Sequence, residues 1–298
     1  MAKRDVSLAL LVAFIWGVNF VVIDLALRDL PPLLLSALRF TLAAIPAILF
    51  VPFPKGTGTT VLAVGLLLGV GKFSVVFYAM TGEVSPGLAS LLIQAQVFFT
   101  IGIAFIWQNE LISKQQALGI IIGVLGLLLF IVADSGNVTV LGLMLMLCAA
   151  MCWAIANSLI KQLPRLNIFH FMVWMSFVPI LPLFLLSYGV ETKTPWLIII
   201  NLPLSTWLAV AFISYCSTLL AFGLWAYLLQ GYSAAKVTPF ALLVPLVGML
   251  AANIVIGEVL TPVELIGCIF ILIALILCVL KPQVLIKSIK KLTLASNG

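Results

Sequence analysis

The residue best suited to bind a charged small molecule is a lysine inside a long apolar run. Lys72 lies near the centre of the apolar segment 61–81, which is about the length needed to cross a bilayer. A lysine at that depth costs about 2.5–3.5 kcal/mol unless it faces a polar cavity. Lys72 is therefore predicted either to handle a substrate or a coupling proton, or to link helices through a carbonyl or a glutamine.

A second cation, Arg39, lies about a third of the way along the segment 32–52. From that depth an arginine side chain can still reach water. We expect Asp24 or Asp29, near the end of the preceding segment, to be its partner. Arg39 is thus interpreted as a tie between two helices, with recognition of a substrate carboxylate as the alternative.

Amide, hydroxyl and aromatic side chains occur at similar depths. Gln94 and Gln96 are about 200° apart around a helix axis, so one is expected to line a cavity while the other bonds a neighbouring helix. With Lys72, the candidate substrate contacts are Trp16, Asn19, Gln94, Gln96, Trp153, Asn157, Tyr215, Thr218 and Trp225. The tryptophans lie near the middle of their segments, which favours cavity lining or interhelical packing over anchoring at the membrane surface.

Two acids and two prolines suit a gate. Glu110 and Glu258 lie at matching segment ends, close to water, and are predicted to be caps or gate residues. Pro239 and Pro245 each remove a backbone hydrogen bond, so we expect kinks and free carbonyls near residues 235 and 241. The segment 86–106 has no interior proline, so it is expected to differ mechanically from 234–256.

Composition identifies the elements that must position these residues. Hydrophobic residues make up 64% of the 298-residue chain and charged residues only 8%, against about a quarter in soluble domains. The apolar runs are long and do not alternate with polar residues, which predicts membrane-spanning helices rather than barrel strands. Breaking the chain at proline, glycine and charged residues predicts ten spans: 6–27, 32–52, 61–81, 86–106, 115–133, 140–160, 168–188, 206–230, 234–256 and 262–280.

Charge distribution predicts the orientation of these spans. With a cytoplasmic N-terminus, the basic loop residues fall almost entirely inside, and only Arg28 and Lys193 fall outside. The positive-inside rule therefore places both termini in the cytoplasm. The basic tail 283–298 is expected either to contact anionic membrane lipid or simply to fix orientation. Because the orientation of the spans explains the excess of basic residues, no nucleic-acid partner is expected.

Catalytic and metal-binding motifs are not found in the sequence. The lone His170 and the scattered cysteines match no zinc or hydrolase motif, and no nucleotide-binding P-loop occurs. We therefore expect no metal, no cofactor and no enzymatic activity, and energy from a substrate gradient or proton exchange rather than from ATP.

An internal duplication organises the chain. Ser85 to Glu110 and Ser233 to Glu258 have the same spacing and similar residues, which predicts two five-helix repeats, 1–135 and 136–282. Because five is odd, the second repeat must enter the membrane from the opposite side. Inverted repeats allow alternating access around a site at the membrane midplane.

Five runs of residues match a known family pattern: Trp16-Gly-Val-Asn19-Phe20, Pro31-Pro32, Leu38-Arg39-Phe40, residues 87–100 and residues 241–248. They resemble the EamA branch of the drug/metabolite transporter superfamily, most closely its bacterial O-acetylserine/cysteine exporters. The resemblance covers nearly the whole chain, although Asn109-Glu110-Leu111 replaces a frequent Gly-Glu-Arg and Lys72 departs from the pattern.

The resemblance implies ten helices, a central cavity lined by both halves, and export of amino-acid-like metabolites across the bacterial inner membrane. The leading hypothesis is thus a secondary active exporter, with a monomer favoured over a dimer. The alternatives are a drug or nucleotide-sugar transporter of the same superfamily, a lipid flippase or a passive channel.

Overall fold

The structure is a computed structural model that describes residues 1–133, 136–163, 167–232 and 234–280. Within these residues the regular structure is helical, apart from an isolated bridge between Val84 and Val138. In the described chain nine helical stretches are long and apolar enough to cross a membrane, and the shorter apolar helix Pro32–Ile48 completes the set of ten. The prediction of an all-helical polytopic membrane protein is confirmed. The predicted lipid-binding tail 283–298 lies outside the described residues.

The helices follow the predicted segments closely, and we number the spans one to ten in chain order. Spans 1 to 5 comprise α1 (Lys3–Leu27), α2 (Pro32–Ile48), α3 with α4 (Gly58–Leu66, Ser74–Ala79), α5 with α6 (Pro86–Leu92, Gln96–Gln108) and α7 (Lys114–Val132). Spans 6 to 10 comprise α8 (Val140–Lys161), α9 with α10 (Ile168–Phe177, Ile180–Leu186), α12 with α13 (Leu204–Ala211, Ala221–Gly231), α15 (Leu243–Ile256) and α16 (Pro262–Val279). The short helices α11 (Pro195–Ile200) and α14 (Ala234–Val237) lie between spans.

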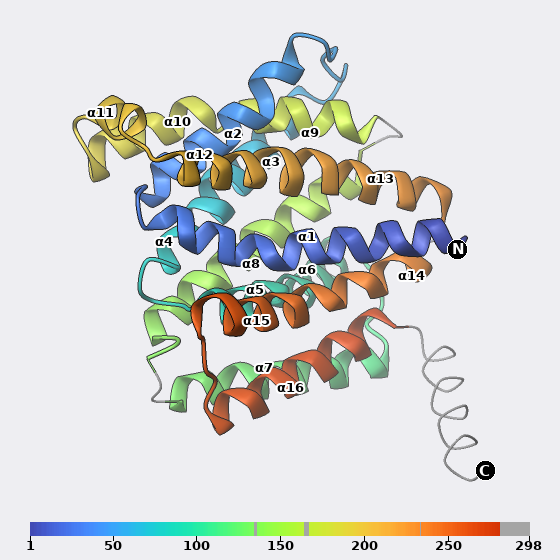
Figure 1. Ribbon diagram of the computed structural model, residues 1–298. Coiled ribbons are helices and arrows are strands. Elements are labelled where there is room, and N and C mark those ends of the chain that lie inside the picture. Colours follow the sequence, from blue (N-terminus) through green and yellow to red (C-terminus); the bar gives the residue numbers. More distant parts are fainter. Residues whose placement is uncertain (134–135, 164–166, 233, 281–298) are drawn as a thin grey trace.

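The helices form a bundle in which α7 and α16 lie side by side at one edge and α2, α9 and α10 lie at the opposite edge (Figure 1). Figure 1 also shows that α1 begins and α16 ends at the same end of the bundle. Equivalent spans of the two halves pack together: α2 on α9, α5 on α15 and α7 on α16. The remaining major pairings are reciprocal, since α1 packs on α15 as α8 packs on α6.

Two spans are interrupted by π-helical turns, which sequence periodicity did not predict. They are Leu67–Phe73 in span 3 and Phe212–Leu220 in span 8, and a third π-helical segment, Ser187–Glu191, ends span 7. In each of the two interruptions, a hydroxyl group donates to the carbonyl five residues earlier: Ser74 Oγ to Gly69 O at 3.0 Å, and Thr218 Oγ1 to Ile213 O at 2.9 Å. Such turns are often found at functional sites.

Spans 4 and 9 both contain a tighter 3₁₀ turn. Span 9 has one at Thr238–Leu242, which includes Pro239, and span 4 has one at Ile93–Ala95. Span 4 makes this turn without an interior proline, so the local backbone of the two spans is similar. That they differ mechanically remains a prediction.

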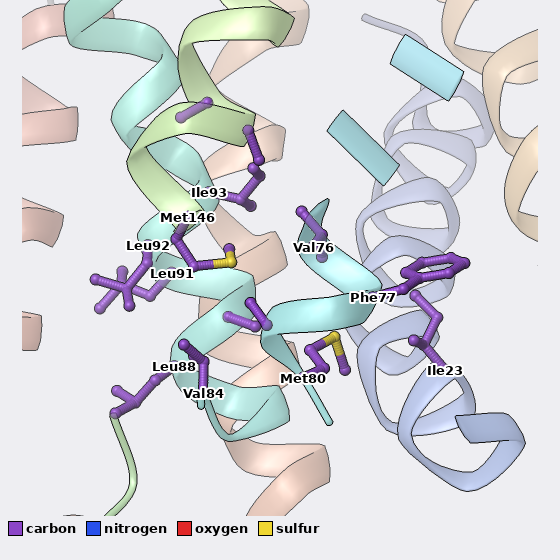
Figure 2. Packing of buried hydrophobic residues seen from close by; sticks show 14 of the residues in the cluster. Ile23, Val76, Phe77, Met80, Val84, Leu88, Leu91, Leu92, Ile93 and Met146 are labelled. Atoms are coloured by element: carbon purple, nitrogen blue, oxygen red, sulfur yellow. The ribbon is translucent and has the colours of Figure 1, made fainter. Parts of the chain in front are cut away.

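The main apolar core lies where spans 3, 4 and 6 meet. Figure 2 shows Phe77 of α4 beside Ile23 of α1, on the opposite side of α4 from Leu92 of α5 and Met146 of α8, and these side chains are buried. This core closes the end of the bundle next to the loop between spans 3 and 4. Polar side chains are therefore collected further along the same helices.

Candidate functional site

Lys72 lies in the π-helical turn of span 3 and is only 7% exposed. Its Nζ lies 3.6 Å from the ring centroid of Trp153 on α8 and 4.0 Å from that of Phe73. Cation–π contacts of this kind contribute about 2 kcal/mol when desolvated. The described contacts of the ammonium group are thus aromatic, rather than the carbonyl or glutamine link considered from the sequence.

Arg39 is buried deeper than predicted, with 1% of its surface exposed. Its Nε and Nη2 both donate to Thr218 Oγ1, at 3.2 and 3.0 Å, which joins α2 to span 8. The expected acidic partners are wrong, because Asp24 pairs with Arg28 and Asp29 accepts a hydrogen bond from Thr206. Those acids lie at the far end of span 1, out of reach of the guanidinium.

The two cations share one aromatic ring. The guanidinium carbon of Arg39 lies 3.7 Å from the centroid of Phe73, the ring that Lys72 also contacts at 4.0 Å. The charges therefore lie within about 8 Å of each other, and their repulsion at an effective dielectric constant of about 20 is about 2 kcal/mol. Phe73 was not identified from the sequence; its only signal there is its position next to Lys72.

Span 8 also carries an aromatic cluster against α1. Trp16 Nε1 donates to Ser217 O at 3.1 Å, and its ring lies 5.0 Å from Phe222 and 5.3 Å from Trp225. Because Ser217 precedes the Thr218 that holds Arg39, this cluster adjoins the cationic pair. Trp16 and Trp225 thus pack on span 8 next to the residue that holds Arg39.

Amide groups bridge spans 4 and 6 one turn from Trp153. Asn157 Nδ2 donates to Gln96 Oε1 at 3.0 Å, while Gln94 Nε2 donates to Ala241 O at 3.5 Å. That carbonyl is the one that Pro245 was predicted to free. Gln94 and Gln96 therefore face different neighbours.

Asn19 is buried on α1, and its Oδ1 has no hydrogen-bond partner in the structure. This leaves an unfilled acceptor in the bundle interior.

A small hollow lies between α9 and span 8, with a volume of about 10 Å³, room for roughly one water molecule. Thr218, the acceptor for Arg39, lines it, together with Ile168, Phe169, Met172, Leu219, Phe222 and Gly223. The hollow therefore connects the start of α9 with the residue that holds the guanidinium.

Three other candidates lie away from this centre. Tyr215 is 40% exposed on the outer side of span 8. Glu110 forms an exposed ion pair with Lys161, with its Oε1 2.5 Å from Nζ. Pro239 lies in the 3₁₀ turn of span 9.

Glu258, in contrast, closes one end of the bundle. Its carboxylate accepts from Ser85 Oγ at 2.7 Å and from the backbone N–H of Gly87 at 2.8 Å. A Cβ at Gly87 would lie 2.6 Å from the carboxylate, so the glycine makes room for the contact. Burial raises the pKa of Glu258, although these hydrogen bonds act in the opposite direction.

Glu191 makes a similar contact that the sequence did not reveal. Its carboxylate accepts from the N–H groups of Leu33 and Leu34, at 2.6 and 3.1 Å, and so caps α2. Pro31-Pro32 marks a helix start in the sequence, but nothing there indicates which acid reaches it.

Comparisons with known proteins give one consistent result. The family model described as the EamA-like transporter family matches residues 4–132 and again 140–280. A probable amino-acid metabolite efflux pump of Salmonella typhimurium is 39% identical over 92% of this chain and 94% of its own length. A protein of Escherichia coli with the same description is 36% identical over the same shares. One solved crystal structure has a TM-score of 0.57 at 18% identity, covering 91% of this chain and 96% of the other, and so supports the fold alone.

Proposed function

This chain belongs to the EamA-like transporter family, and from that premise we propose that it exports small polar metabolites by alternating access. Amino acids and cysteine-pathway compounds are the proposed substrates. Two relatives are described as probable amino-acid metabolite efflux pumps, which supports this choice. As a multi-pass membrane protein with bacterial transporter relatives, it fits the bacterial inner membrane.

The observation that carries this proposal is a polar centre buried inside an otherwise apolar bundle. Arg39 and Lys72 are almost completely buried midway along their spans, where charged groups are expensive and mark transport pathways. The two cations lie on spans 2 and 3, and Thr218 of span 8 and Trp153 of span 6 contact them from the other half. Contributions from both halves are what a transporter needs if one half is to move against the other around a bound substrate.

Reciprocal helix packing supports the proposed inverted repeat of 1–135 and 136–282. Spans 2, 4 and 5 pack on spans 7, 9 and 10, their counterparts in the other half, and span 1 contacts span 9 as span 6 contacts span 4. A pseudo-two-fold axis would produce this pattern. Two halves of similar energy can exchange conformations, which is the basis of alternating access.

We assign Glu258 the role of a latch. It ties the end of span 9 to the start of span 4, while its repeat counterpart Glu110 is exposed and pairs with Lys161. In the proposed cycle the opposite conformation exchanges these roles, so that Glu258 is released. Pro239 and Pro245 lie in the span that must bend.

Counterflow into proteoliposomes tests the function. Vesicles preloaded with a panel of amino acids, O-acetylserine and cysteine should take up one labelled compound saturably and faster than empty vesicles. Uptake without saturation and without dependence on preloading would indicate a channel. If folded protein exchanges none of these compounds, the amino-acid proposal is wrong, and lipid, drug and nucleotide-sugar substrates become the next panel.

Proton coupling through Lys72 is tested in the same vesicles. If Lys72 carries the coupling proton, wild-type counterflow should depend on pH and Lys72→Met should retain exchange without that dependence. An unchanged pH profile in the variant would exclude Lys72 from coupling.

A further inference from the structure

Two buried cations, Arg39 and Lys72, have no acidic partner among the residues that the structure describes. Among the described residues the ion pairs are Arg28–Asp24 and Lys161–Glu110, and neither involves Arg39 or Lys72. The acidic residues that the structure describes lie in loops or in the terminal turns of helices: Asp5, Asp24, Asp29, Glu83, Glu110, Glu191, Glu258 and Glu264. In the described part of the chain, therefore, no carboxylate lies in the middle of the bundle.

The existing contacts leave donors unused. Thr218 accepts from Nε and Nη2 of Arg39, but Nη1 is buried without a hydrogen-bond partner. The described contacts of Lys72 Nζ are the faces of Trp153 and Phe73. Aromatic faces attract a cation but carry no net negative charge, so the centre keeps an excess of positive charge.

The spacing of the cations suits one small anion. Both charges contact the Phe73 ring, at 3.7 Å for Arg39 and 4.0 Å for Lys72, so they lie within about 8 Å of each other, which is about the span of a carboxylate that accepts one hydrogen bond at each oxygen. Arginine recognises carboxylates through paired N–H donors, and Nη1 is the donor still free. An anion bound by both cations would also relieve their mutual repulsion.

We propose that Arg39 and Lys72 form an anion subsite that selects amino-acid-like metabolites of net negative charge. The carboxylate of the substrate binds Arg39 Nη1 and Lys72 Nζ. The substrate has a net negative charge either because it carries a second, acidic side chain or because an acyl group on its amine removes the positive charge. A neutral zwitterion is disfavoured, because its ammonium group would lie near two cations with only amides and aromatic rings to receive it. This inference rests on the proposed function and narrows its substrate class.

The test uses compounds that differ mainly in charge. Counterflow is measured with glutamate against glutamine, which have nearly the same shape, and with N-acetylserine against serine. We expect the anionic member of each pair to exchange about tenfold better or more, as charged hydrogen bonds in a buried site imply. Lys72→Met and Arg39→Gln should reduce that ratio towards one, whereas Lys72→Arg should keep it. Arg28→Gln, which removes an exposed cation, is the matched control and should change nothing.

The outcomes separate this proposal from the proposed function. Robust counterflow with equal or better exchange of glutamine and serine would overturn the anion subsite and leave the exporter intact. If no compound exchanges, the amino-acid exporter fails, and thermal stabilisation of the purified protein decides about the subsite. If glutamate raises the thermal midpoint more than glutamine does, and this difference is lost in Lys72→Met, the anion subsite is supported. Equal rises of the midpoint with the two compounds would overturn the subsite.

Discussion

Single residues in the bundle interior differ in whether the protein itself satisfies them. Thr218 accepts two hydrogen bonds from Arg39, and Trp16 donates to a backbone carbonyl. Arg39 Nη1 and Asn19 Oδ1 are buried without a partner in the described structure. Unsatisfied buried groups destabilise a fold by about 1–3 kcal/mol each, so we interpret them as groups kept for a substrate.

Replacing Lys72 by methionine should stabilise the protein while reducing its preference for anionic substrates. The variant is relieved of an insertion cost of about 3 kcal/mol and of a repulsion from Arg39 of about 2 kcal/mol. It also loses two cation–π contacts of about 2 kcal/mol each, so the free energy of unfolding should rise by roughly 1 kcal/mol. The change in stability is measured as a thermal midpoint. The purified protein is heated in detergent, and size-exclusion chromatography gives the amount that remains folded at each temperature. Lys161→Met removes an exposed pair and should change stability by less than about 0.5 kcal/mol. A lower midpoint for Lys72→Met would show that the lysine holds the fold together.

At the scale of elements, glycines and irregular turns decide how closely the helices approach. A Cβ at Gly65 would lie 2.7 Å from the backbone oxygen of Met175, so span 3 and α9 touch there. Just beyond that contact, the π-helical turn changes the register of span 3. This places Lys72 against Trp153 of α8 rather than on the face that packs against α9.

Gly65→Ala should therefore destabilise the bundle, because a backbone carbonyl cannot move aside as a flexible side chain can. We expect a loss of about 1–3 kcal/mol, visible as a lower thermal midpoint and a lower yield of monodisperse protein. Gly102→Ala is the control, since a Cβ there meets nothing within 4 Å. Equal stability of the two variants would mean that α9 does not pack on span 3 as described.

At the scale of the whole molecule, one end is held closed by contacts that cross between the halves. Glu258 of the second half caps the start of span 4, and Glu191 caps α2. Burial raises the pKa of Glu258 in this conformation, and neighbouring Glu264 acts in the same direction. Release into water would return that pKa to its ordinary value. A proton therefore binds more tightly to the closed form, and low pH favours closure.

Opening of this end should accordingly increase as pH rises through the pKa of Glu258 in the closed form. A cysteine replacing the buried Leu88, in a background without other cysteines, can be labelled with an impermeant maleimide. Labelling in wild-type context should gain more with rising pH than labelling in Glu258→Gln, which mimics the protonated form and should stay closed. Both proteins carry the same cysteine, so the pH dependence of the thiol itself cancels when the labelling rate in the wild-type context is divided by the rate in Glu258→Gln. This ratio of labelling rates measures opening, and a ratio that does not change with pH would refute the latch.

Orientation is a second property of the whole molecule. Basic loop residues predict that both termini lie in the cytoplasm. Green fluorescent protein fused after residue 298 should then fluoresce in a bacterial host, and alkaline phosphatase fused after Gly136 should be active. The reverse pattern would invert the molecule and place the Glu258 latch on the cytoplasmic side.

The sequence by itself determined the membrane class, the positions of the ten spans and the repeated pattern. These follow from local composition and from the bilayer thickness, which any one segment must satisfy alone. It also singled out Lys72 and Arg39, because charge at that depth is costly wherever the side chain points. Only the tertiary structure decided which side chains contact these two cations. Thr218, Phe73 and Trp153 reach the cations from other positions in the chain through helix packing and two π-helical turns. The partner of a side chain depends on register between helices, and register depends on non-local contacts that no single segment encodes.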